Sequence, residues 1–253
     1  MAWNYNNEFY LSVGDRGFEA SKIVLKILKS FIDPKIIFDY GCGYGIWAKN
    51  AASQFPSSKV VGFDLNSTIA KNKVRKELLQ NLHYESINFE THEYSYKKSN
   101  LAICLEVVEH ISQDRANLHI LRMCQTSDVI LFSGAVKGQG GTGHINEQTL
   151  EYWVNQFKSH GWIPIDIIRP QIKHNHKIPS YYKNNILLFV HEKNYDKILS
   201  TISDPNSRTF FKERTAISTD QRKFITKVLH YLLAQVPASF VSRLATIKNR
   251  ITG

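Results

Sequence analysis

Apolar residues follow two different spacings along the chain, and the two spacings alternate. Short continuous apolar runs are typical of buried strands, and a three-to-four-residue period is typical of helices. We expect strands at 35–40, 59–65, 82–88, 101–106 and 128–133. We expect helices at 18–31, 46–55, 67–79, 113–125 and 147–160. Strands that alternate with helices form a parallel sheet covered on both faces, so the pattern predicts a doubly wound α/β fold.

Two further apolar runs, 162–168 and 185–190, predict the last two strands of the sheet. The segment between them, 169–184, shows no helical period of sufficient length for a crossover helix. Because parallel neighbours need such a crossover, we expect these two strands to pair antiparallel. The complete prediction is a mostly parallel seven-stranded sheet.

The alternation covers residues 18–192, which we expect to form one domain. Residues 1–17 are polar and aromatic and are predicted to be a lid segment, and 193–253 are predicted to be a basic helical appendage. From 201 onward, nine Lys and Arg stand against three Asp and Glu, a net charge of +6. Packing on the domain, homodimer formation, peripheral contact with an anionic membrane and contact with a polymeric anion all stay open for this tail.

The composition is that of a globular protein and limits its partners. The 253 residues are 43% hydrophobic and 21% charged, which excludes a wholly disordered chain. No apolar run is long enough for a transmembrane helix, and the N-terminus does not resemble a signal peptide. Three scattered cysteines indicate neither disulfides nor a cysteine metal site, and we expect a cytoplasmic protein. The net charge of +10 favours an anionic partner.

A glycine cluster follows the strand predicted at 35–40 and precedes the next predicted helix. Gly41, Gly43 and Gly45 stand at alternate positions after Asp39, and Asp64 ends the following strand. Glycines at the carboxyl end of a strand let a ligand approach the main chain closely, and an acidic residue at the next strand can accept both hydroxyls of a ribose. The site therefore predicts a nucleoside-containing cofactor, with a plain structural turn as the alternative.

The spacing of these glycines distinguishes two cofactor classes. Dinucleotides require Gly-x-Gly-x-x-Gly, but the third glycine here comes one residue early and Ile46 takes its place. S-adenosylmethionine-binding loops typically read Asp/Glu-x-Gly-x-Gly-x-Gly, which the sequence from Asp39 to Gly45 fits. The block Leu105-Glu-Val-Val-Glu-His-Ile111 is similar to a second signature of such proteins. Over residues 18–192 the chain thus resembles a class I, Rossmann-like, S-adenosylmethionine-dependent methyltransferase.

The resemblance implies roles for the residues that match its motifs. Asp39 would fix the loop, and Gly41 and Gly43, with Gly45 closing the loop, would pass under the methionine part of the cofactor. Asp64 would hold the ribose and Leu65 would pack on the adenine ring. These roles, together with those below, make up the expected cofactor site.

At the adenine amino group many relatives place an Asp after the third strand. The matching positions here are Asn88 and Phe89, a departure from the family pattern, although an Asn side chain still offers one acceptor oxygen. Glu106, after the fourth strand, is expected either to orient the cofactor or to take part in catalysis.

Two histidines are candidates for the base that an oxygen nucleophile needs. His110 follows Glu106, and His144 lies in a glycine-rich segment after the fifth strand. We favour His144, and a role in cross-linking loops is the alternative for both.

The next residues, Asn146 and Glu147, are expected to cap the following helix. Gly-His-Ile-Asn-Glu-Gln followed by Tyr-Trp resembles a methyltransferase subgroup associated with bacterial surface-polysaccharide and natural-product pathways.

The segment between the last two strands is basic and aromatic, and we expect it to contact the substrate. The candidate contacts are Lys173, His174, His176 and Tyr181. Cations there suit a phosphate or a nucleotide-linked group, and a solvated basic loop is the alternative. No carboxylates accompany the two histidines, so no metal is expected.

These observations predict S-adenosylmethionine-dependent O-methylation of a sugar or phosphorylated small molecule in a capsule or surface-glycan pathway. N- or C-methylation of a small metabolite and RNA methylation stay open, as does a non-catalytic binding module. The sequence contains no aromatic-plus-basic RNA-binding module, so we expect a small-molecule partner and no nucleic acid.

Overall fold

The computed structural model describes residues 17–66, 79–91 and 96–202. The chain divides into two compact units, 1–216 and 217–253, and every described residue lies in the first. Three predicted segments lie outside the described residues: the lid apart from its last residue, the helix expected at 67–79 apart from its last residue, and the tail from 203 onward.

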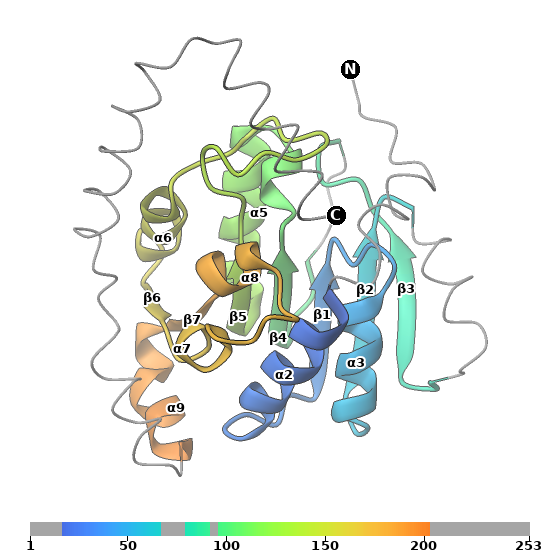
Figure 1. The fold of residues 1–253 in the computed structure, drawn as a ribbon. Coiled ribbons are helices and arrows are strands. Elements are labelled where there is room, and N and C mark those ends of the chain that lie inside the picture. The colour runs from blue at the N-terminus through green and yellow to red at the C-terminus, as the bar shows by residue number, and fades with distance from the viewer. Residues whose placement is uncertain (1–16, 67–78, 92–95, 203–253) are drawn as a thin grey trace, which may run out of the picture. The chain divides into compact units, whose positions relative to one another are not determined.

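Seven strands form one sheet in the order β3-β2-β1-β4-β5-β7-β6 (Figure 1). Their bounds are β1 Ile36–Tyr40, β2 Lys59–Asp64, β3 Leu82–Ser86, β4 Ser99–Leu105, β5 Ser127–Ser133, β6 Trp162–Ile165 and β7 Leu187–His191. Strands β1 to β5 pair parallel with their neighbours, whereas β7 is antiparallel to both β5 and β6. The mostly parallel sheet with its antiparallel last pair is as predicted.

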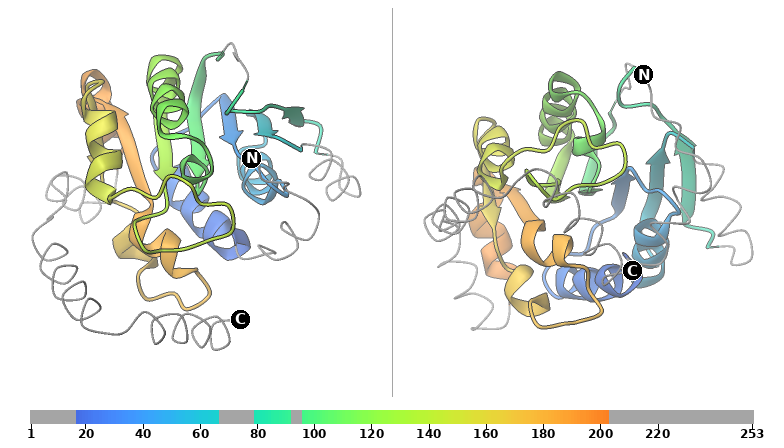
Figure 2. Two further views of the ribbon diagram at one scale, coloured as in Figure 1. Left: turned by 90° about the horizontal axis from the view of Figure 1, so that it is seen from above. Right: turned by 45° about the horizontal axis from the view of Figure 1, so that its top comes forward.

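Helices cover both faces of this sheet. Helices α2 and α3 lie on one face, and α5 and α6 lie on the other (Figure 2). The helices are α2 Phe18–Lys29, α3 Ile46–Gln54, α5 Gln113–Thr126, α6 Leu150–Lys158, α7 Arg169–Ile172, α8 Ser180–Asn185 and α9 Tyr195–Thr201, with 3-10 turns η2 Val108–His110 and η3 Glu192–Asn194. The segment between β6 and β7 therefore contains two short helices where no helix was expected, but neither is long enough to cross the sheet.

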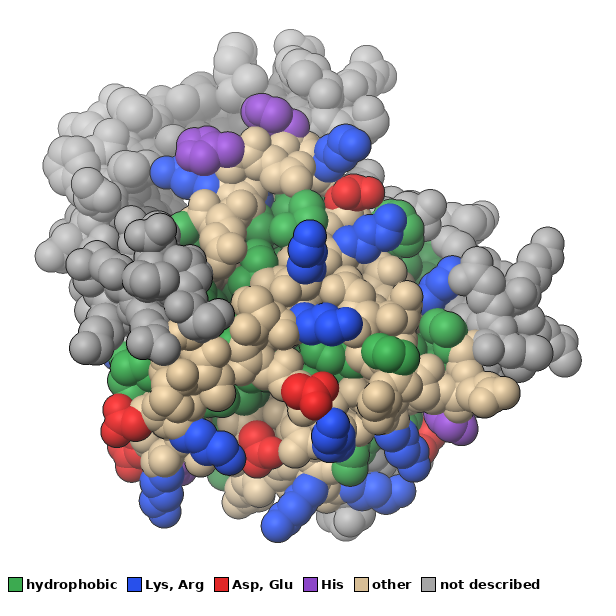
Figure 3. All heavy atoms as spheres, turned by 90° about the horizontal axis from the view of Figure 1, so that it is seen from below, with side chains coloured by type: hydrophobic (Ala, Val, Ile, Leu, Met, Phe, Trp, Pro, Cys, Tyr) green, Lys and Arg blue, Asp and Glu red, His purple; other side chains and the backbone are tan. Residues whose placement is uncertain are grey.

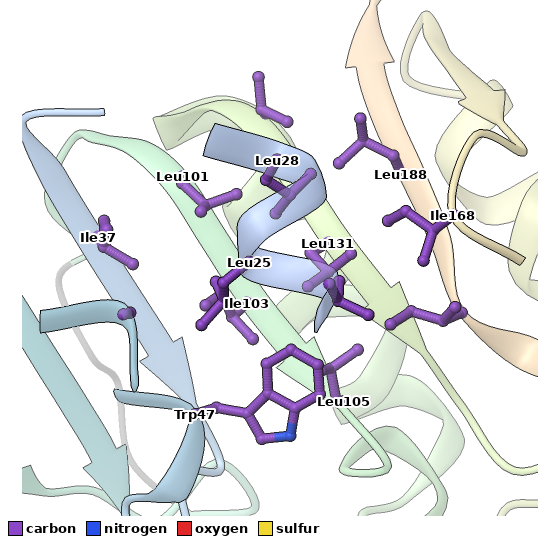
Figure 4. Packing of buried hydrophobic residues seen from close by; sticks show 14 of the residues in the cluster. Leu25, Leu28, Ile37, Trp47, Leu101, Ile103, Leu105, Leu131, Ile168 and Leu188 are labelled. Atoms are coloured by element: carbon purple, nitrogen blue, oxygen red, sulfur yellow. The ribbon is translucent and has the colours of Figure 1, made fainter. Parts of the chain in front are cut away.

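The main core lies between α2 and the sheet. In α2, residues 20, 24, 25 and 28 are buried, which is the spacing of one helical face. Leu25 and Leu28 point from this face toward Ile37, Leu101 and Ile103 on the strands (Figure 4). Complete burial of one such side chain stabilises the fold by about 1.5–3 kcal/mol. The contact holds α2 against β1, the strand that the glycine loop follows.

Aromatic side chains form the core on the opposite face. Phe157 of α6 stacks on Phe189 of β7 at 3.9 Å between ring centroids, and Phe132 of β5 meets Phe157 at 4.9 Å. On β5, Leu131 belongs to the α2 side and Phe132 to this side, because successive strand residues point to opposite faces. Both faces of β5 are therefore buried, as expected for a central strand.

Helix α9 continues the packed unit beyond β7. The Thr201 hydroxyl donates a hydrogen bond to the Phe31 carbonyl at 2.8 Å, and Ile202 is buried in the core cluster.

None of the described helices is long and apolar enough to cross a membrane. The three cysteines are free, and two of them, Cys42 and Cys104, are buried. On the face shown in Figure 3, Lys and Arg side chains are spread out with Asp and Glu among them.

Candidate active site

The site lies where the order of the strands reverses. From β1 the chain proceeds outward to β2 and β3, and then returns to place β4 on the other side of β1. Ligands of such sheets bind outside the carboxyl ends of the strands at this reversal. The glycine loop follows β1 there, and Glu106 follows β4. The fold thus brings together two motifs that are more than 60 residues apart in the sequence.

The glycine loop adopts a backbone that requires glycine. Gly41, Gly43 and Gly45 have φ values of 75°, 53° and 76°, in the left-handed region. A Cβ on Gly41 would lie 2.2 Å from a methyl group of Val107, so a side chain has no room at this position. The Gly41 N–H donates to the Phe63 carbonyl at 2.7 Å, which ties the loop to the end of β2.

Asp64 contacts the glycine loop directly. One oxygen of its carboxylate accepts a hydrogen bond from the Gly43 N–H at 2.8 Å, and the other accepts from the Asn66 N–H at 3.3 Å. The next residue, Leu65, is a large apolar side chain that is 45% exposed. The acidic group and an exposed apolar surface thus stand at the same edge, next to the loop.

Asp39 is a buried acid at the base of the loop. It is 3% exposed, and its Oδ2 has no hydrogen-bond partner among the described residues. Burial, assisted by the nearby charge of Asp64, raises the pKa of Asp39 to about 7, although a hydrogen bond from the Ala48 backbone opposes the rise. A positively charged ligand nearby would favour its ionised form.

Asn88 and Phe89 follow β3. The Asn88 side-chain oxygen accepts a hydrogen bond from the Glu90 N–H at 2.9 Å and so closes a local turn. The Phe89 ring packs against His119 at 4.6 Å and Tyr40 at 6.1 Å between ring centroids. Phe89 therefore supports β1 from within the fold, and the role of both residues toward the cofactor stays a prediction.

Glu106 has a strained backbone held by a polar network. Its φ of 56° is the one positive value at a non-glycine residue in the described ranges, and such strain costs about 1–3 kcal/mol. Its Oε2 accepts from the Gln139 side chain at 2.6 Å, and Gln139 in turn accepts from Asn185 at 2.8 Å. Its Oε1 is buried without a hydrogen-bond partner, and burial raises the pKa of Glu106.

Sequence reasoning missed Gln139 and Asn185. The one available signal was the place of Gln139 in the loop after β5, at the carboxyl edge of the sheet where ligands bind. Asn185 is fully buried and ends α8, so this network joins the end of β4 to α8 through the loop.

His144 is held by Glu147 in the loop 134–149. The distance between His144 Nδ1 and Glu147 Oε1 is 2.8 Å, and the Glu147 carboxylate also accepts from the N–H groups of Gly138 and Gly140 at 2.9 Å and 2.8 Å. Burial alone would raise the pKa of Glu147, but these hydrogen bonds hold it below its usual value. The carboxylate therefore accepts the Nδ1 proton, which leaves the Nε2 lone pair of His144 as the basic atom.

The second candidate base, His110, lies edge-on to His144, with 4.8 Å between ring centroids. Its Nδ1 is 3.4 Å from the Gly143 carbonyl. Burial and the neighbouring His144 lower the pKa of His110 to about 4. The ring is therefore neutral near pH 7 and is a weak base.

The prediction that Asn146 and Glu147 cap the following helix is wrong. Helix α6 begins at Leu150, and Thr149 caps it by accepting from the Tyr152 N–H at 3.0 Å. The Asn146 side chain donates instead to the Val108 carbonyl at 3.1 Å. It thereby fastens the loop to η2, while Glu147 serves His144.

The predicted substrate residues lie on the connection between β6 and β7. Because β6 runs parallel to β5, this connection leaves the sheet at the same edge as the glycine loop. The side chains of Lys173, His174 and His176 are exposed, and that of Tyr181 is half-buried. The structure thus places them on this edge of the fold, but no contact among the described residues joins them to His144, and their role stays a prediction.

Neighbours of these residues fix the connection in place. The Tyr182 hydroxyl meets the Trp47 indole N–H at 3.2 Å, which ties α8 to the start of α3 beside the glycine loop. Arg169 forms a two-point ion pair with Asp166 at 2.8 Å and 2.6 Å, so this cation is used within the protein.

The doubly wound sheet with an antiparallel β7, the glycine loop after β1 and an acid at the end of β2 define the fold of class I methyltransferases. A family profile described as a methyltransferase domain matches residues 14–165, more than half of the chain. The chain belongs to this family, and the expected enzyme class is confirmed.

Solved structures share this fold at low sequence identity. An O-methyltransferase family protein from Burkholderia thailandensis is 10% identical with a TM-score of 0.54, and the match covers 76% of this chain and 64% of that one. The magnesium protoporphyrin IX methyltransferase from Synechocystis, solved with bound SAH, is 17% identical with a TM-score of 0.56, and the match covers 75% and 90%. The chain thus spans less than two thirds of the Burkholderia protein. No curated protein sequence matches the chain.

Proposed function

We propose that the protein transfers the methyl group of S-adenosylmethionine to a hydroxyl oxygen of a sugar or phosphorylated small molecule, in a pathway of capsule or surface-glycan assembly. The observation that carries oxygen as the acceptor is the His144–Glu147 pair, a histidine with one defined basic nitrogen next to the glycine loop's edge of the sheet. The fold shared with an O-methyltransferase family protein supports the same reaction.

The residues at the end of β1 and β2 fit the methyl donor. Val107 leaves no room for a side chain at Gly41, so the loop offers only main-chain atoms to a ligand at this position. Gly41 and Gly43 would lie along its methionine part, Asp64 would accept from the ribose hydroxyls, and Leu65 would cover the adenine. When bound, this cofactor supplies an electrophilic methyl carbon on a positively charged sulfur. The buried, unpartnered oxygen of Asp39 suits such a cation.

His144 would remove the proton from the acceptor. The bound cofactor would supply the methyl carbon to the acceptor oxygen and would depart as a neutral thioether that keeps the electron pair of the broken carbon–sulfur bond. The hydroxyl proton passes to Nε2 of His144, and the nearby Glu147 carboxylate stabilises the imidazolium that results. The loop 134–149, which Asn146 fastens to η2, would keep water from the reacting atoms.

An anionic group on the acceptor would explain the basic connection between β6 and β7. Lys173, His174 and His176 present exposed cationic or neutral donors at the same edge as the site. A phosphate or nucleotide diphosphate on the acceptor would take charge-assisted hydrogen bonds from them, with Tyr181 beside them.

The test separates cofactor binding from turnover. Purified protein would be titrated with S-adenosylhomocysteine by calorimetry and then assayed with labelled S-adenosylmethionine against a panel of phosphorylated and nucleotide-linked sugars. We expect His144→Ala to lower kcat about a hundredfold or more with unchanged affinity for S-adenosylhomocysteine.

Other products of the same assay would refute the proposal. Methylated nitrogen or carbon in the product, or transfer to RNA with strongly salt-dependent polynucleotide binding, would each replace the hydroxyl acceptor. An equal loss of affinity and turnover in His144→Ala would remove His144 from the chemistry.

A further inference from the structure

Three potential metal ligands converge beside the glycine loop's edge of the sheet. Glu109 and His110 lie in η2, and His144 comes from the loop 134–149. One ligand atom from each of them lies within 4.8 Å of the other two. We propose that Glu109, His110 and His144 bind a divalent transition-metal cation such as Mn²⁺, Fe²⁺ or Zn²⁺, a site that the sequence did not predict.

Glu109 is the strongest indication of a missing positive partner. Its side chain is 0% exposed. The backbone N–H groups of Glu109 and Ala135 lie near its carboxylate, but neither carboxylate oxygen has a hydrogen bond of ordinary geometry to any described residue. Its nearest ion-pair contact is His144 Nε2 at 4.0 Å, and no Lys or Arg of the described ranges forms an ion pair with it. A buried charge without a partner is strongly disfavoured, and a bound cation would remove that penalty.

A second buried carboxylate reinforces the need for positive charge. Glu106 lies near enough to Glu109 to repel it electrostatically. The Oε1 atom of Glu106 is buried and lacks a hydrogen-bond partner, while its Oε2 is held by Gln139. Two nearby buried carboxylates repel each other, and a bound cation would relieve that repulsion.

The environment of His144 is that of a metal-ligating imidazole. A histidine ligand almost always donates its other ring N–H to a carboxylate or carbonyl, and His144 Nδ1 does so to Glu147 at 2.8 Å. Its Nε2 then faces Glu109. His110 completes the set from the edge of the same ring, at 4.8 Å between centroids.

The chemistry of the donors selects the ion. Two imidazoles and one carboxylate suit first-row transition metals, whereas Mg²⁺ prefers oxygen ligands and its own water. Bonds of about 2.0–2.2 Å place two donors on one cation roughly 3–4.3 Å apart, so small side-chain rotations would close this set around an ion. Three protein ligands leave coordination positions open for an acceptor oxygen.

The role of the ion in activating the acceptor rests on the proposed function, but the binding of the ion does not. A coordinated hydroxyl passes its proton to water more readily than a free one, so the cation would activate the acceptor as a Lewis acid. Because the ion takes the Nε2 lone pair of His144, proton removal by His144 and metal ligation by His144 are alternatives. Metal binding can therefore be measured without knowledge of the acceptor.

The experiment uses the full chain after removal of metals with EDTA. Mn²⁺ would be titrated by electron paramagnetic resonance of the free ion, and Zn²⁺ and Mg²⁺ by calorimetry. We expect one Mn²⁺ or Zn²⁺ per chain and weaker binding of Mg²⁺. Glu109→Gln and His144→Ala should each weaken binding at least about tenfold, and Glu147→Gln should weaken it about tenfold or somewhat more.

The matched controls are His174→Ala and His176→Ala, which remove histidines on the exposed connection and should bind metal as the unmodified protein does. Calorimetry with S-adenosylhomocysteine would show that each variant is folded. If Glu109→Gln does not fold, His144→Ala and His110→Ala decide the question.

Two results would overturn the metal site: no saturable binding of Mn²⁺ or Zn²⁺, or equal affinity in the ligand variants and the controls. Full hydroxyl methylation by the EDTA-treated, metal-free protein would overturn the role of the ion in activating the acceptor and would leave His144 as the base. Stoichiometric metal binding without hydroxyl methylation would refute the proposed function and leave the site intact.

Discussion

Replacement of Gly41 by alanine tests whether the glycine loop is as tightly determined as its geometry indicates. An alanine at φ 75° carries a backbone strain of about 1–2 kcal/mol. Its Cβ would also lie 2.2 Å from one methyl group of Val107 and 3.0 Å from the other. Such overpacking costs about 1–3 kcal/mol, so we expect Gly41→Ala to lower the free energy of unfolding by about 2–5 kcal/mol.

Two companion variants separate strain from overlap. Gly138 has a similar φ of 84°, and a Cβ there would meet nothing within 4 Å, so Gly138→Ala should show the backbone strain alone, about 1–2 kcal/mol. Val107→Ala removes both methyl groups from a buried side chain and should cost about 1.5–3 kcal/mol by itself. Because it also removes the overlap, the Gly41→Ala/Val107→Ala double variant should be more stable than the sum of the single effects predicts.

The assay is urea unfolding followed by circular dichroism for the four variants, with calorimetry of S-adenosylhomocysteine binding in parallel. We expect a favourable coupling of about 1–3 kcal/mol between positions 41 and 107. Strictly additive losses, or a Gly41→Ala variant no less stable than Gly138→Ala, would refute the claim that Val107 excludes a side chain from this loop.

Three further predictions concern charged groups. The pKa of Asp39 is about 7 in the folded protein against 3.8 unfolded, so the folded state holds the proton more tightly and the free energy of unfolding should fall by up to about 4 kcal/mol as pH rises from about 4 to 7. Asp39→Asn should abolish that fall in urea titrations at pH 5 and pH 8, and an unchanged pH dependence would contradict this. Asp64→Ala removes the acceptor of the Gly43 N–H and should weaken S-adenosylhomocysteine binding at least about tenfold in calorimetry, unlike Asp128→Ala at the opposite edge of the sheet. Arg169→Met leaves the buried Asp166 carboxylate unpaired and should cost about 3 kcal/mol in urea unfolding, and a loss below about 1 kcal/mol would show that the pair is dispensable.

The sheet and the glycine loop could be predicted from the sequence because their signals are local. Apolar runs mark each strand, and the positive φ values at Gly41, Gly43 and Gly45 require the residue type that the sequence shows. The antiparallel β7 followed from the absence of a long helix before it, and the short α7 and α8 did not change that result.

The partners of the site residues could not be predicted because they join distant segments. Gln139 meets Glu106 across 33 residues and Asn185 across 46, and no local pattern encodes such contacts. Glu147 was expected to serve the nearby helix, since an acid before a helix is a common cap, but Thr149 occupies that position. The lack of a hydrogen bond of ordinary geometry between the buried Glu109 carboxylate and any described residue likewise depends on the folded environment.

The two ends of the loop 134–149 are fastened to different parts of the fold. This arrangement links the binding of the acceptor to the binding of the methyl donor. Near its start, Gln139 connects it to the strained Glu106 and to α8; near its end, Asn146 connects it to η2. A bound molecule that displaces His144 must therefore also displace η2, the turn after β4. This turn lies next to the part of the site where the methyl donor is proposed to bind. Binding of the acceptor should therefore change the affinity for the methyl donor, and binding of the methyl donor should change the affinity for the acceptor by the same factor.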